Sequence, residues 1–185
     1  MVAKRIFLVL VSAYVVWLAF AYEYHFLDGV NLAFHEAGHL FLGFMGRTVH
    51  FLGGTIGQLF FPVACAIHFI QSGRHFEAWL MGVWFAESLM NTARYLGDAQ
   101  AMSLPLVGGH IHDWNWLLTR WGGLSSCETI ATALHVAAVG IAVACLIGAW
   151  RSTDPFEELT DQPTPPIPPI PSIGSSLNGP NQPRS

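Results

Sequence analysis

Five residues near the start of the chain have the types and the spacing of a metallohydrolase site. The segment His35-Glu36-Ala37-Gly38-His39 has the form H-E-x-x-H. Residues four apart lie on the same face of an α-helix, so the two imidazoles can bind one metal ion with the glutamate beside it. Zinc suits such a site, because two histidines and a carboxylate leave a fourth position for water. We therefore expect His35 and His39 to bind one Zn²⁺ and Glu36 to act as the catalytic base and then as proton donor to the leaving amine.

The surroundings of this motif strengthen the prediction. His35, Glu36 and His39 interrupt an otherwise apolar stretch from Asn31 to Gly46. Ionisable groups in an apolar helix are costly to bury and are usually functional. A bound metal ion or a polar partner removes that cost.

A third ligand must come from elsewhere in the chain. Between His75 and Met102, the polar residues Glu87, Asn91, Arg94, Tyr95 and Asp98 fall within an arc of about 100° on a helix. We expect Asp98 to be the third zinc ligand and Asn91 to position the substrate or the ligand. The alternative is that this polar stripe has no functional partner, and that Glu87 and Arg94 form an ion pair within the helix.

Other candidates for the third ligand follow in the loop Gly108-Gly109-His110-Ile111-His112-Asp113. His110 and His112 alternate, so in an extended loop they point to one side, and Asp113 adds a carboxylate. The alternative is an interfacial loop, because three tryptophans follow it and tryptophan is enriched at the headgroup level of membranes. The other five histidines stand singly and are interpreted as interfacial or packing residues: His25, His50, His68, His75 and His135. The chain has no adjacent histidine pair, which argues against a membrane di-iron hydroxylase.

The elements that position these residues are predicted to be membrane helices. The chain of 185 residues is 52% hydrophobic and 11% charged, against about 25% charged residues in soluble domains. Backbone groups inside a bilayer must be paired within the segment, so long apolar runs are helices. We expect an all-α, polytopic membrane helix bundle of four or five transmembrane helices over residues 1–150, a multi-pass protein of the cell membrane. The runs are Ile6–Tyr22, Asn31–Gly46, Thr55–Ile70, His75–Met102 and Glu128–Trp150.

Both ends of the chain allow two interpretations. Ile6–Tyr22 is a first transmembrane helix or a cleaved signal peptide, because Ala19-Phe20-Ala21 matches a small-x-small cleavage pattern. Nine of the eleven prolines lie between Pro155 and Pro183, which predicts a disordered, proline-rich tail over residues 151–185. A proline-binding module is a candidate partner of this tail, and a solvated tail is the simpler interpretation. The net charge of -4 argues against nucleic acid as a partner.

The first motif also resembles a known family. His35-Glu36-Ala37-Gly38-His39, followed by Gly46, Val49 and Leu52-Gly53-Gly54, is similar to the first block of the site-2-protease-like membrane zinc metallopeptidases. The stretch from Asn91 to Asp98 has nearly the spacing of that family's second block, without its prolines and with Ala99 in place of a glycine. The resemblance implies His35 and His39 as zinc ligands, Glu36 as base and Asp98 as third ligand.

Together these observations predict a zinc-dependent intramembrane peptidase that hydrolyses a peptide bond of a membrane-protein or peptide substrate. Gly53 and Gly54, with Thr55, Ile56 and Gly57, are predicted to offer exposed backbone to an unwound substrate strand or to form a flexible turn. A non-peptidase metal-binding membrane protein is the alternative function, and a metal-free helical scaffold is the third.

Overall fold

The computed structural model describes residues 2–107 and 111–153, and all of the regular secondary structure in these residues is helical. The prediction of an all-α fold is thereby confirmed for the described part of the chain. The predicted proline-rich tail lies outside it from residue 154 onward. The α-helices are α1 (Val2–Phe20), α2 (Phe26–Leu42), α3 (Arg47–Gln71), α4 (His75–Gly97), α5 (Asp113–Trp121) and α6 (Cys127–Arg151), with short 3₁₀ turns at Gly43–Met45 and Leu124–Ser126.

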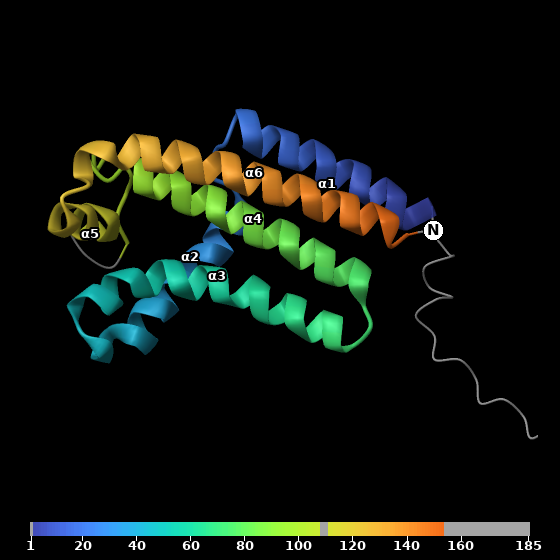
Figure 1. Ribbon diagram of the computed structural model, residues 1–185, viewed down its shortest axis with the longest axis horizontal. Coiled ribbons are helices and arrows are strands. Elements are labelled where there is room, and N and C mark those ends of the chain that lie inside the picture. The colour runs from blue at the N-terminus through green and yellow to red at the C-terminus, as the bar shows by residue number, and fades with distance from the viewer. Residues whose placement is uncertain (1, 108–110, 154–185) are drawn as a thin grey trace, which may run out of the picture.

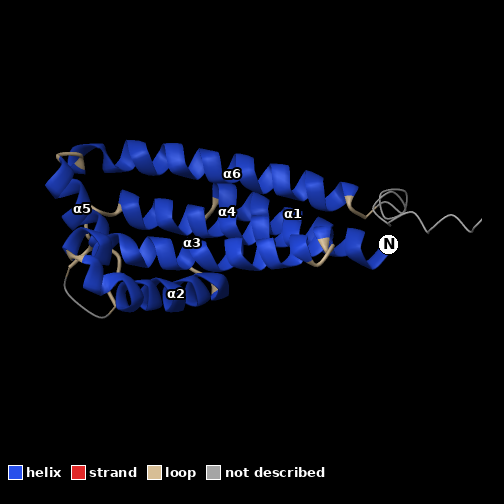
Figure 2. Ribbon diagram, turned by 60° about the horizontal axis from the view of Figure 1, so that its bottom comes forward, coloured by secondary structure: helices blue, strands red, loops and turns tan. Residues whose placement is uncertain are grey.

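Four long helices, α1, α3, α4 and α6, run along the long axis of an elongated bundle (Figure 1, Figure 2). Helix α4 packs against both α3 and α6, and α2 packs against α3. The short helix α5 closes one end of the bundle, and the start of α1 meets the end of α6 at the other. There Arg5 Nε donates a hydrogen bond to Thr153 Oγ1 at 3.2 Å.

Small side chains bring α4 and α6 close together. Ala86 of α4 and Ala138 and Ala142 of α6 are buried in the main core, together with Met90 and with Leu18 of α1. Small residues at helix–helix contacts let backbones approach and gain van der Waals contact, which is the main source of packing energy where lipid surrounds the bundle.

Three glycines make an even closer contact between α2 and α3. A Cβ atom added to Gly38 would lie 2.0 Å from the carbonyl oxygen of Gly53 and 3.0 Å from Cα of Gly57. The sequence predicted either exposed backbone or a flexible turn at Gly53 and Gly54. Both predictions are wrong, because the two residues lie inside α3 and are buried. Their backbones serve the packing of α2, because glycine at these positions leaves room for the neighbouring helix.

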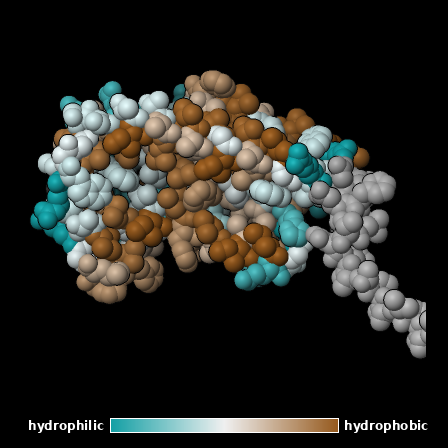
Figure 3. Space-filling model, viewed as in Figure 1, coloured by the Kyte–Doolittle hydropathy of each residue, from teal (hydrophilic) through white to brown (hydrophobic). Residues whose placement is uncertain are grey.

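Three helices are long and apolar enough to cross a membrane: α1, α3 and α6, the last counted from Leu124. Hydrophobic residues dominate the central part of the face shown in Figure 3, while hydrophilic residues gather toward its ends. Many large apolar side chains point outward, among them Phe60 of α3 and Val136 of α6. Such a surface is compatible with a membrane protein, since soluble proteins rarely expose large contiguous apolar patches.

Candidate metal centre

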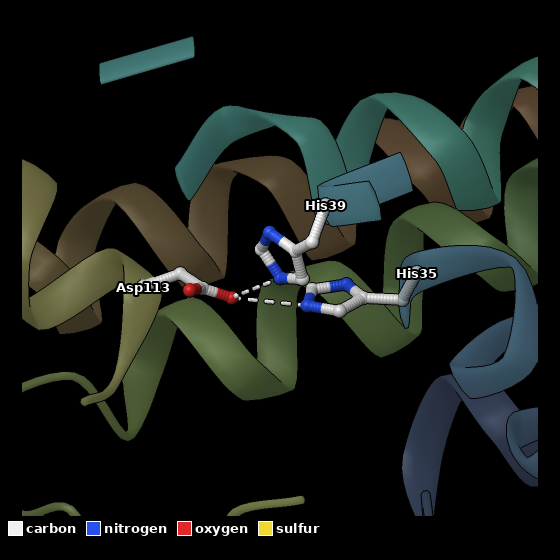
Figure 4. A group of neighbouring side chains, drawn as sticks. All are labelled: His35, His39 and Asp113. Atoms are coloured by element: carbon white, nitrogen blue, oxygen red, sulfur yellow. Dashed lines mark hydrogen bonds and ion pairs between the residues drawn. The ribbon is translucent and has the colours of Figure 1, made fainter. Parts of the chain in front are cut away.

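Helix α2 and the first residue of α5 bring three potential metal ligands together. Nε2 of His35 lies 3.0 Å from Oδ2 of Asp113, and Nε2 of His39 lies 3.1 Å from the same oxygen. Both rings point from α2 toward this carboxylate (Figure 4). The three donor atoms lie within 4.8 Å of one another, and His35 and Asp113 are buried. The helical spacing of the two histidines thus places them on one face, as four-residue separation requires.

The second ring nitrogen of each histidine is held by the protein. Nδ1 of His39 lies 2.7 Å from the backbone carbonyl oxygen of His50. A carbonyl only accepts hydrogen bonds, so this nitrogen carries the proton. In the neutral form of His39 the lone pair is therefore on Nε2, the atom that faces Asp113.

His35 is held in the same way by a buried glutamine of α3. Nδ1 of His35 lies 3.2 Å from Oε1 of Gln58. The amide nitrogen of Gln58 donates to the carbonyl oxygen of Ser88 at 3.0 Å and to Thr92 Oγ1 at 2.8 Å. These two acceptors fix the orientation of the amide, so Oε1 must accept from His35. A residue that orients a ligand through its far nitrogen is typical of metal sites.

Asp113 is positioned by the loop that leads into α5. His112 precedes it as the N-terminal cap of α5, where its Nδ1 accepts from the backbone nitrogen of Asn115 at 3.3 Å. The backbone nitrogen of Asp113 donates to the hydroxyl of Tyr95 at 3.2 Å, and the Tyr95 ring stacks on His112. Burial alone would raise the pKa of Asp113, but the neighbouring His35 and His39 rings outweigh it when they carry a proton on Nε2, and they lower that pKa to about 2. The carboxylate is therefore ionised at neutral pH.

This donor set fits a divalent cation. Two neutral imidazoles would aim the lone pairs of His35 and His39 at the anionic oxygen of Asp113, which is repulsive unless a proton or a cation lies between them. Two histidine nitrogens and one carboxylate oxygen are ligands that zinc prefers, and they leave an open fourth position.

A cavity of about 640 Å³ opens beside the three donor atoms. Glu36 lines it, as do Asn91 and Arg94 of α4. The apolar loop of residues 104–107 lines the same cavity. The volume falls within the range usual for small-molecule sites. Glu36, the predicted base, and the three donor residues line this one cavity.

The structure groups Asp113, not Asp98, with the two histidines. Asp98 follows α4 and accepts hydrogen bonds from the backbone nitrogens of Ser103 and Leu104 at 2.9 and 3.0 Å. Burial opposes ionisation of Asp98, but the bonds from Ser103 and Leu104 hold its pKa below the usual value. Its carboxylate is used to close a turn, and the expectation that it joins His35 and His39 is not met.

The remaining predicted residues are distributed between the cavity and its walls. His112 is buried beside Tyr95 and belongs to the cap of α5, while His110 lies outside the described residues. Asn91 donates to Oδ1 of Asp28 at 2.7 Å. Gly54 packs against the ring of His35: a Cβ atom added to Gly54 would lie 2.3 Å from Nε2 of His35.

Two residues that complete the centre, Gln58 and Tyr95, are not among the catalytic, metal-binding or substrate-positioning residues that the sequence predicts. Gln58 is a single polar side chain inside the apolar run of α3, and that isolation is the signal that could have found it. Tyr95 was noted as part of the polar stripe of α4, and its contact with Asp113 follows from that placement.

No protein-family model, curated protein or solved structure matches this chain significantly. The residues of the centre are therefore the basis on which a function can be proposed.

Proposed function

We propose that this chain is a zinc-dependent peptidase embedded in a membrane, with His35, His39 and Asp113 as the metal ligands. The observation that carries the proposal is the approach of two oriented imidazoles to one ionised, buried carboxylate beside a cavity. When it is bound, zinc supplies Lewis-acid chemistry that makes water a stronger nucleophile near neutral pH.

In this proposal Glu36 moves the protons. Its position one residue after His35 places it beside the donor atoms and on the wall of the cavity. Glu36 accepts a proton from the attacking water and passes it to the leaving amine. Gln58 and the carbonyl oxygen of His50 hold the two histidines in the tautomer that leaves Nε2 unprotonated.

The substrate class follows from the surroundings of the site. We propose that the substrate is a peptide segment of a membrane protein, because the cavity combines the apolar residues 104–107 with the polar Asn91 and Arg94. A helical substrate must unwind locally before cleavage, since the hydrogen bonds of a helix shield its carbonyl groups. The outward-facing apolar side chains of the long helices support a multi-pass placement in the bilayer.

The test is the Glu36→Gln variant of the full chain, reconstituted in liposomes with a labelled model membrane substrate. We expect the variant to bind as much zinc as the wild type and to lose cleavage by at least about a hundredfold. His68→Gln, which changes an exposed histidine of α3, is the matched control and should cleave normally. Full cleavage by Glu36→Gln would contradict the proposal, and zinc binding without cleavage by the wild type would favour the non-peptidase metal protein.

A further inference from the structure

A second group of potential ligands lies at the other end of α2. His25 immediately precedes α2, Asp28 lies in its first turn, and Glu87 comes from the middle of α4. One donor atom from each residue lies within 4.8 Å of the others. Asp28 lies seven residues before His35, which is about 10 Å along a helix. The two groups therefore share no ligand.

The charges of this group balance only if a proton or a cation is added to it. The side chains of Asp28 and Glu87 are each only 1% exposed. In the described part of the chain, the ion pairs of both are made to His25: Asp28 Oδ2 lies 2.7 Å from Nδ1, and Glu87 Oε1 lies 3.6 Å from Nε2. Two carboxylates facing one imidazole leave a buried negative charge, which is expensive unless a proton or a cation neutralises it.

The hydrogen bonds around Glu87 show which of its two carboxylate oxygens lacks a close hydrogen-bond donor. Asn31 Oδ1 accepts from Trp84 Nε1 and Ser88 Oγ at 2.9 and 3.1 Å, which fixes the orientation of the Asn31 amide. Its Nδ2 therefore faces Glu87 and donates to Oε2 at 2.8 Å. The other oxygen, Oε1, faces the hydroxyl of Tyr22 at 3.4 Å.

That hydroxyl is already committed elsewhere. Tyr22 donates its single proton to Oδ1 of Asp28, which also accepts from Asn91 Nδ2. Oδ2 of Asp28 accepts from the backbone nitrogen of His25 at 2.9 Å. Donors thus reach both oxygens of Asp28 and Oε2 of Glu87, while Oε1 of Glu87 faces the committed hydroxyl of Tyr22 and Nε2 of His25, a nitrogen that also contacts the hydroxyl of Tyr14.

We propose that His25, Asp28 and Glu87 form a second binding site, for a divalent transition-metal ion that ties the α1–α2 junction to α4. The histidine nitrogen argues against Ca²⁺ and Mg²⁺, which take oxygen ligands, whereas Zn²⁺ and Mn²⁺ accept this mixture of ligands. Asn31, Asn91 and Tyr22 orient the two carboxylates, as outer hydrogen-bond partners do in metal sites. This inference does not depend on the proposed peptidase function.

The experiment measures zinc per chain by elemental analysis of the full-length protein in detergent, after saturation with Zn²⁺ and removal of the excess. We expect two zinc ions in the wild type, one in Glu87→Gln and one in His25→Gln. Glu77→Gln, which changes an acidic residue near the start of α4 that pairs with Arg74, is the control and should keep two. The zinc ion that remains in each variant shows that the bundle is still folded.

Asp113→Asn separates this inference from the proposed function. That variant should retain the ion at His25 and lose the one at His35 and His39. A single zinc in the wild type that disappears in Glu87→Gln would support the second site and contradict the first. Zinc content that is the same in wild type, Glu87→Gln and His25→Gln would overturn the second site, and would indicate that a shared proton neutralises the two carboxylates.

Discussion

At the scale of single residues, the centre depends on which carboxylate reaches the two histidines. Asp98 and Asp113 were both candidates, and they differ in the structure by the donors that surround them. Asp98 accepts from backbone nitrogens of its own turn, whereas Asp113 faces His35 and His39. Sequence spacing could not decide between them, because the contact joins residues 74 and 78 positions apart.

This difference predicts opposite results for two similar variants. Asp113→Asn should weaken zinc binding at the first centre by far more than tenfold, because the amide replaces the anionic ligand. Asp98→Asn should leave zinc affinity within about twofold of the wild type. Competition titration with a zinc-binding dye measures both. If Asp98→Asn lost zinc affinity while Asp113→Asn kept it, the result would support Asp98 as the third zinc ligand, as first predicted from the sequence.

The hydrogen bond from His35 to Gln58 gives a second prediction. Gln58→Leu removes the acceptor that fixes the His35 tautomer and should lower zinc affinity by about 10- to 100-fold, as expected for outer-shell partners. Gln71→Leu, an exposed change at the end of the same helix, is the matched control. An affinity unchanged by Gln58→Leu would show that packing alone orients the ring.

At the scale of elements, the position of the two histidines depends on the contact between α2 and α3. The sequence predicted helices over five apolar runs, and each of the five long helices overlaps one of these runs. It misassigned the stretch from Gly53 to Gly57, since glycines usually mark turns. Within a bundle the same residues allow close helix packing instead, and only the partner Gly38 on α2 reveals that role.

This contact predicts that Gly38→Ala destabilises the fold. The added methyl group would meet the backbone oxygen of Gly53, which cannot rotate away, and overpacking typically costs about 1–3 kcal/mol. Gly29→Ala in the same helix is the control, because its nearest neighbour would lie 3.6 Å away. Denaturant unfolding in detergent compares the two. If Gly38→Ala and Gly29→Ala had the same free energy of unfolding, α2 and α3 would be able to move apart without destabilising the fold.

At the scale of the whole molecule, a bound ion would join α2 and α5, which are separated in the chain by the two long helices α3 and α4. His35 and His39 belong to α2, and Asp113 opens α5 at the end of the bundle. Three residues of the polar stripe of α4 contact other elements: Glu87, Asn91 and Tyr95 hydrogen-bond to Asn31, Asp28 and Asp113. Which partners it meets could not be predicted, because tertiary packing sets them.

Chelation should therefore loosen one end of the protein more than the other. Metal bound only by the folded state stabilises it, so removing zinc should lower the Tm. It should also increase hydrogen exchange in α5 and the loop before it. The central part of α6, around Ala138 and Ala142, is the internal reference. Uniform exchange along the chain after chelation would contradict a local link between α2 and α5.

The contact between Arg5 and Thr153 places both described ends of the chain away from α5 and the cavity residues near it. An affinity tag or fluorescent protein attached before Val2 would consequently leave the entrance to the candidate centre unobstructed. Immobilising the molecule through such a handle would present that entrance to added reagents, which makes the chain well suited to surface-based measurements.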